Sequence, residues 1–80
     1  MRLPRDFNAD QFIKLLLKIG YVPSRQSGSH IRLTTNIKGQ HHVTVPNHDP
    51  IKIGTLNSIL KDIAEHFHIT KEELLKRLLN

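Results

Sequence analysis

The spacing of the apolar residues switches from a helical repeat to a strand repeat and back, and this switch restricts the fold more than any other feature of the chain. Residues 7–19 have the helical repeat, residues 21–45 alternate with a period of two, and the helical repeat returns after residue 54. The sequence therefore predicts an α+β domain in which helices cover one face of a single sheet.

Capping residues mark the limits of the first predicted helix. Asn8 is followed three residues later by Gln11, as in a capping box, and Phe7 can pack on Phe12 as a hydrophobic staple. Gly20 ends the helical repeat, because glycine readily adopts the left-handed conformation that stops a helix.

Two more helices are expected in the last third of the chain. The second begins near Gly54 or Thr55. Its apolar stripe comprises Leu56, Ile59, Leu60, Ile63 and Phe67. Thr70 and Glu73 repeat the capping-box pattern and open a short final helix that ends near Leu79.

Three short strands fit the middle of the chain, at about residues 21–26, 29–35 and 41–45. Turn residues at Ser27-Gly28 and in residues 36–39 separate them, so neighbouring strands should pair antiparallel. The predicted fold is a two-layer α+β domain of order α-β-β-β-α with a short extra C-terminal helix.

The two faces of the predicted sheet differ in chemistry. Ile31 and Leu33 point toward the helices, whereas His30 and Arg32 point the other way, since side chains alternate across a strand. The same alternation in the third strand places His42 on the second face. We therefore expect a solvent-facing surface that carries two histidines and an arginine.

Length and composition narrow the possible classes of protein. Eighty residues suit one domain over residues 1–80. No cysteine is present, so disulfides, thiolate nucleophiles and cysteine-containing zinc sites are excluded. No long apolar run occurs, and Met1–Asp6 has no signal-peptide pattern, so a cytoplasmic protein that does not enter a membrane is expected.

The basic charge is concentrated in the middle of the chain. Residues 11–54 contain six lysines or arginines and one acid, Asp49, which accounts for the whole net charge of +5. A local basic excess attracts phosphates, which makes nucleic acid the leading partner. The alternative that the charge only keeps the surface soluble stays open at this point.

Four segments of the chain together carry a resemblance. They are Gly20-Tyr21, Arg25-Gln26-Ser27-Gly28-Ser29-His30, Val43-Thr44-Val45-Pro46-Asn47-His48 and Gly54-Thr55-Leu56-Asn57-Ser58-Ile59-Leu60. In their order and spacing they resemble the HicA family of toxins. The glycine-serine-histidine motif is weak alone, but the other segments make the resemblance specific.

The resemblance implies a fold, an activity and a partner. HicA toxins have a fold like that of double-stranded-RNA-binding domains, act as ribonucleases on mRNA and are neutralised by HicB antitoxins. The essential histidine of the family falls on His30. We therefore expect a metal-independent endoribonuclease without a cofactor, whose partners are mRNA and a HicB-like antitoxin that together with it forms a hetero-oligomer.

A histidine suits this reaction. RNA carries its own nucleophile, the 2′-hydroxyl, so a ribonuclease needs groups that move protons and stabilise the charged phosphorane. An imidazole, with an ordinary pKa of about 6.5, acts as base or acid near neutral pH and contributes on the order of 10²- to 10⁴-fold. The sequence predicts that His30 moves a proton and leaves open in which direction.

The neighbours of His30 are candidates for holding the phosphate. Gly28 allows a close backbone approach and Ser29 adds a donor, although Gly28 also suits a turn alone. His48, in the loop before the second helix, either contacts phosphate, transfers a second proton or has no special role. The basic candidates for RNA contacts are Arg25, Arg32 and Lys38.

The remaining histidines do not predict a metal site. His41 and His42 are adjacent in one strand and so point to opposite faces, and His66 and His68 are two apart near a helix end. Two other functions fit the same pattern. One is a non-catalytic RNA-binding module of the related fold, and the other is a protein-interaction domain.

Overall fold

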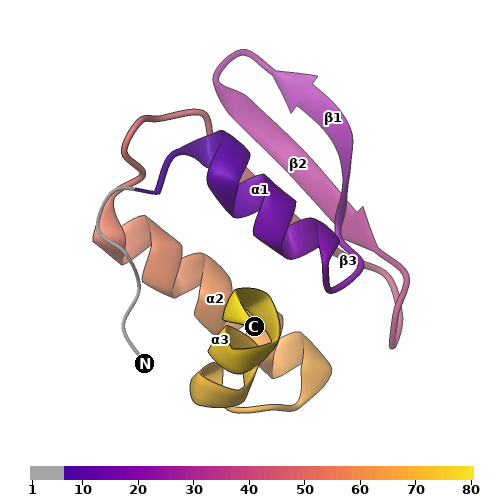
Figure 1. The fold of residues 1–80 in the computed structure, drawn as a ribbon. Coiled ribbons are helices and arrows are strands. Elements are labelled where there is room, and N and C mark those ends of the chain that lie inside the picture. Colours follow the sequence, from indigo (N-terminus) through magenta and orange to yellow (C-terminus); the bar gives the residue numbers. More distant parts are fainter. Residues whose placement is uncertain (1–6) are drawn as a thin grey trace.

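Three helices and three strands form the structure, a computed structural model that describes residues 7–80. They are α1 (Ala9–Leu17), β1 (Val22–Ser27), β2 (His30–Thr35), β3 (His41–Pro46), α2 (Ile53–Phe67) and α3 (Lys71–Leu79) (Figure 1). This order confirms the predicted α-β-β-β-α fold with an extra C-terminal helix, the arrangement of double-stranded-RNA-binding domains. The prediction that Met1–Asp6 has no signal-peptide pattern concerns residues outside the described range.

The sheet is an antiparallel meander with β2 in the centre. Ile31 pairs with Val45 and Leu33 with Val43, so these apolar side chains share the inner face. Arg32 pairs with Thr44 on the outer face. The predicted division into a buried and a solvent-facing side is therefore confirmed, because Leu33, Val43 and Val45 are buried whereas Arg32 and Thr44 are exposed.

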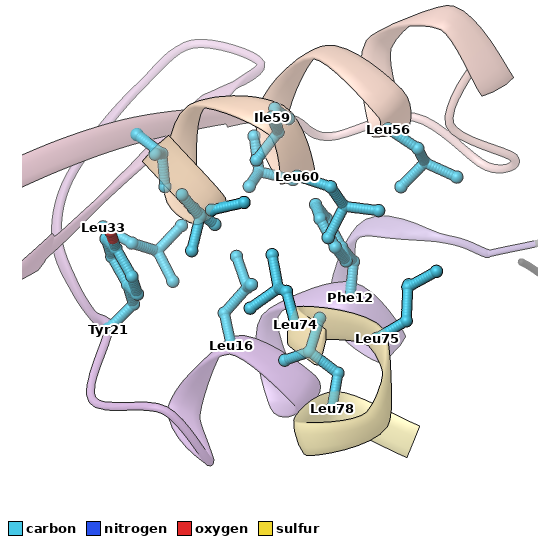
Figure 2. Packing of buried hydrophobic residues seen from close by; sticks show 14 of the residues in the cluster. Phe12, Leu16, Tyr21, Leu33, Leu56, Ile59, Leu60, Leu74, Leu75 and Leu78 are labelled. Atoms are coloured by element: carbon cyan, nitrogen blue, oxygen red, sulfur yellow. The ribbon is translucent and has the colours of Figure 1, made fainter. Parts of the chain in front are cut away.

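The core lies between the inner face of the sheet and the helices (Figure 2). It contains Phe12 and Leu16 from α1, together with buried leucines and isoleucines of α2 and α3. Burying a side chain of this size contributes on the order of 2 kcal/mol. Helices α1 and α2 thus cover the inner side of the sheet, α3 packs against these two helices, and the outer side of the sheet is left uncovered.

The start of α1 matches the predicted caps. The Asn8 side chain accepts a hydrogen bond from the Gln11 N–H at 2.9 Å, and the Gln11 side chain accepts one from the Asn8 N–H at 3.0 Å. The rings of Phe7 and Phe12 stack with their centroids 6.3 Å apart. Gly20 has φ +99°, a left-handed value, where the chain leaves the helix.

The later helices differ slightly from the prediction. α2 begins at Ile53, one residue before Gly54, and its N-cap residue Lys52 makes no side-chain hydrogen bond. At α3 the predicted capping box is only half formed. Thr70 Oγ1 accepts from the Glu73 N–H at 3.1 Å, but the Glu73 carboxylate lies 3.9 Å from Arg77 one turn later. That ion pair competes for the carboxylate that a complete box requires.

Candidate functional site

A tight turn between β1 and β2 positions His30. Gly28 has φ +56°, and among the two turn residues, Gly28 and Ser29, only the glycine is left-handed, as in a type II′ hairpin turn. No atom lies within 4 Å of where a Gly28 Cβ would stand, so the backbone is open to solvent there. His30 follows as the first residue of β2, with its side chain exposed.

The loop after β3 begins beside His30. His30 pairs with Ser27 on one side and with Pro46 on the other, and the Asn47 N–H donates to the Ser29 carbonyl at 2.6 Å. The exposed His48 comes one residue later. The structure therefore brings the turn, His30 and the start of the loop with His48 to one end of the sheet.

Two arginines face each other next to this end. Arg25 of β1 is paired directly with Arg32 of β2, so both project from the same face, and both are exposed. Like charges in opposite positions of a sheet destabilise it. None of the three strands contains an aspartate or a glutamate that would compensate them. An oxyanion such as a phosphate or a carboxylate would relieve such a pair, because each guanidinium can donate two parallel hydrogen bonds.

A polar chain crosses the outer face beyond the arginines. Ser24 Oγ lies 2.8 Å from Thr34 Oγ1, which lies 2.7 Å from His42 Nδ1. Ser24 reaches this face because the register of β1 shifts between Pro23 and Arg25. Alternation in β2 and β3 predicted the positions of Thr34 and His42, but no sequence signal indicated the bulge.

Lys38 does not join this group. It lies in the turn between β2 and β3, whereas His30 follows the turn at the other end of β2 (Figure 1). The six residues of β2 separate the two ends by about 17 Å. Of the predicted phosphate-binding residues, Arg25, Gly28, Ser29, Arg32 and His48 are therefore near His30, and Lys38 is not.

A second group of titratable side chains lies where β3 meets α2. The Asp62 carboxylate only accepts hydrogen bonds, so His41 Nε2–H donates to it at 3.2 Å, and His41 Nδ1 accepts from the Tyr21 hydroxyl at 2.7 Å. The His66 ring stacks on His41 with centroids 4.4 Å apart, and its Nε2–H donates to the Ile37 carbonyl at 2.9 Å. Sequence reasoning missed this group because its members are distant in the chain. Within residues 7–80, no three histidines or carboxylates come together as metal ligands.

Titration of Tyr21 tests this second group. Burial, and secondarily the negative charge of Asp62, raises the pKa of Tyr21 from 10.0 to about 12. Between these values the folded chain keeps a proton that the unfolded chain has lost, so the free energy of unfolding should fall as pH rises through this window. Tyr21 is the only tyrosine, which makes the ultraviolet absorbance of tyrosinate a direct readout. Asp62→Asn should lower the midpoint, and a wild-type midpoint near 10 would contradict the buried hydroxyl.

Fold and site together define a small α+β domain of the double-stranded-RNA-binding type, with an exposed histidine beside a basic pair on its open sheet face. A sequence model of the family described as "HicA toxin of bacterial toxin-antitoxin" matches residues 9–64. The chain therefore belongs to the HicA toxin family. Searches of curated proteins and of solved structures found no match.

In the part of the chain that the structure describes, no helix is long and apolar enough to cross a bilayer.

Proposed function

We propose that this toxin is a metal-independent endoribonuclease that cleaves mRNA, with His30 as its catalytic residue. The observation that carries the proposal is the placement of His30. It is exposed at the head of β2, on the same face as Arg32, two residues along the strand and therefore about 7 Å away. That spacing suits a histidine that acts on the sugar hydroxyl while the arginine holds the adjoining phosphate.

The reaction needs two proton transfers. One removes the proton of the 2′-hydroxyl, whose oxygen attacks the phosphorus, and the other protonates the 5′ oxygen when its bond to phosphorus breaks. In this proposal His30 carries out one transfer, and His48, in the loop that begins beside it, carries out the other. Arg25 and Arg32 stabilise the negative charge of the phosphorane, aided by the exposed backbone at Gly28 and Ser29.

A non-catalytic RNA-binding module is the second candidate, and the fold itself favours it. Double-stranded-RNA-binding domains recognise RNA by shape and phosphate contacts without cleaving it. Incubating the purified toxin with end-labelled RNA separates the two functions. New, shorter products at defined positions support the nuclease, whereas a shifted but intact RNA at high protein concentration supports the module.

The opposed arginines should control how strongly RNA affinity depends on salt. Arg25→Ala and Arg32→Ala should each reduce the slope of log affinity against log salt by roughly 0.7, the contribution of one phosphate contact on a single strand. Lys38→Ala is the matched control, since Lys38 lies at the other end of β2. Fluorescence anisotropy at several salt concentrations measures the slopes. Equal slopes in wild type and both arginine variants would move the RNA surface elsewhere.

Membership in a toxin-antitoxin family implies an antitoxin partner. We propose that this partner is a HicB-like protein whose acidic surface covers His30, Arg25 and Arg32 in a hetero-oligomer. Carboxylates against the two guanidinium groups would give fast, electrostatically steered association and would exclude phosphates from the site. The antitoxin should therefore compete with RNA for the inactive His30→Ala toxin. A complex that binds RNA as tightly as the free toxin would refute occlusion.

A further inference from the structure

A hollow of about 580 Å³ opens at the end of the domain opposite His30. The end of α1, the turn between β2 and β3, the end of α2 and the α3 residues Leu74 and Arg77 line it. The side chains that matter for its chemistry are Leu17, Lys18, Ile37, Lys38, Phe67 and Arg77. Because α1 ends beside the turn that follows β2, the hollow lies at the end of the sheet remote from the tight turn before His30 (Figure 1).

Apolar side chains are left open to solvent in this hollow. Leu17 is 45 % exposed and Ile37 is 50 % exposed, two of the largest such exposures in residues 7–80. The Ile37 side chain lies over Gly20, and the Ile37 carbonyl accepts a hydrogen bond from His66. Two exposed aliphatic residues that line one hollow with a polar rim are typical of an interaction surface.

The rim of the hollow is basic. Lys18, Lys38 and Arg77 surround it. Lys18 Nζ already donates to the Leu78 carbonyl at the end of α3, at 3.2 Å, and Arg77 lies 3.9 Å from Glu73. Lys38 makes no ion pair with any of the residues that the structure describes. The rim thus has three cations and one neighbouring carboxylate, which favours an acidic ligand.

From this combination we infer that the hollow is a docking site for an acidic, amphipathic segment of a partner protein, separate from the face that bears His30. An apolar side chain of the segment would pack between Leu17 and Ile37, and its carboxylates would pair with Lys38 and the other cations of the rim. Such a segment can bind while the His30 face is free or occupied by RNA, because the two sites lie at opposite ends of β2.

Other occupants fit less well. A second copy in a two-fold contact would bring the same cations face to face. Residues 1–6 of this chain contain two arginines and one aspartate, so their charge does not complement the rim. RNA bases stack on exposed aromatic rings, and the only ring of the hollow, Phe67, is 5 % exposed. An acidic protein segment matches both the apolar floor and the basic rim.

The test uses a synthetic helical peptide with leucines along one face and glutamates on the other, added to the isotope-labelled toxin. We expect amide chemical shifts to change at Leu17, Ile37 and Lys38 and to stay constant at His30. Lys38→Glu should weaken binding on the order of tenfold. Lys52→Glu is the matched control and should change affinity only slightly. Lys52 is the N-cap residue of α2, whereas the hollow lies at the C-terminal end of that helix. Lys38 is chosen over Lys18 because Lys18 also caps α3.

Two further variants separate docking from general attraction to a basic protein. A scrambled peptide of the same composition keeps the charge but loses the leucine face, and it should bind much more weakly. Ile37→Ser should reduce peptide affinity while RNA cleavage continues at the wild-type rate. Cleavage measured in the same preparations tests the nuclease independently of the docking site.

Four outcomes would overturn the inference. The first is that the scrambled peptide binds as tightly as the amphipathic one, and the second is that the peptide shifts the amide signals of Arg25 and Arg32 and not those of the hollow. The third is that the toxin self-associates and that this alone changes the signals of Leu17 and Ile37. The fourth is that RNA changes the signals of the hollow and binds the Ile37→Ser variant less tightly. The last two would assign the hollow to a second copy or to nucleic acid.

Discussion

His30→Ala should reduce RNA cleavage by about 10²- to 10⁴-fold, the usual contribution of a group that transfers a proton in the transition state. The same change should alter the free energy of unfolding by less than about 1 kcal/mol. The side chain is exposed on the outer face of the sheet, so its removal opens no cavity. Initial rates on labelled RNA and urea unfolding followed by circular dichroism measure the two effects.

His42→Ala is the matched control for this experiment. His42 is exposed on the same face but pairs with Thr34, so it lies about 14 Å along the sheet from His30. We expect cleavage to continue in this variant. Cleavage by purified His30→Ala at close to the wild-type rate would remove His30 from the mechanism, and loss of the circular dichroism signal would make it a structural residue instead.

The second large effect on cleavage is expected from a change in the RNA substrate. A single 2′-deoxy nucleotide on the 5′ side of a mapped cleavage position should block cleavage of that bond, because the attacking oxygen is then missing. Other positions in the same RNA should still be cut, which provides the internal control. Cleavage should also continue in excess EDTA, since an attacking 2′-hydroxyl does not need a water activated by a divalent ion.

The deoxy substitution and the EDTA treatment each have one result that would contradict the proposal. Cleavage at the deoxy position would show that water, and not the sugar, is the nucleophile. Activity that EDTA abolishes and added metal restores would replace the proposed proton transfers by metal-assisted hydrolysis. Gel analysis of the product ends completes the comparison, because attack by the 2′ oxygen first leaves a cyclic phosphate.

The sequence by itself determined the elements and the faces of this protein. The helical repeat around Phe12 and the alternation of Ile31 with His30 and Arg32 are local patterns, so each can be interpreted without knowing the rest of the fold. The same holds for the cap at Asn8, whose hydrogen bonds join residues three apart. The exposure of His30 on the outer face followed directly from this alternation.

Only the tertiary structure decided which of these residues meet. Arg25 faces Arg32 because the turn consists of Gly28 and Ser29, not of Ser27 and Gly28 as the sequence predicted, so that Ser27 pairs with His30 and Arg25 with Arg32. The register shift beyond Arg25 then brings Ser24 to the outer face. Lys38 shares the basic stretch with the arginines but lies at the opposite end of β2, because the chain reverses direction at each turn. Periodicity assigns a side chain to a face, whereas strand pairing and helix packing decide its neighbours, and neighbours determine where a phosphate or a partner can bind.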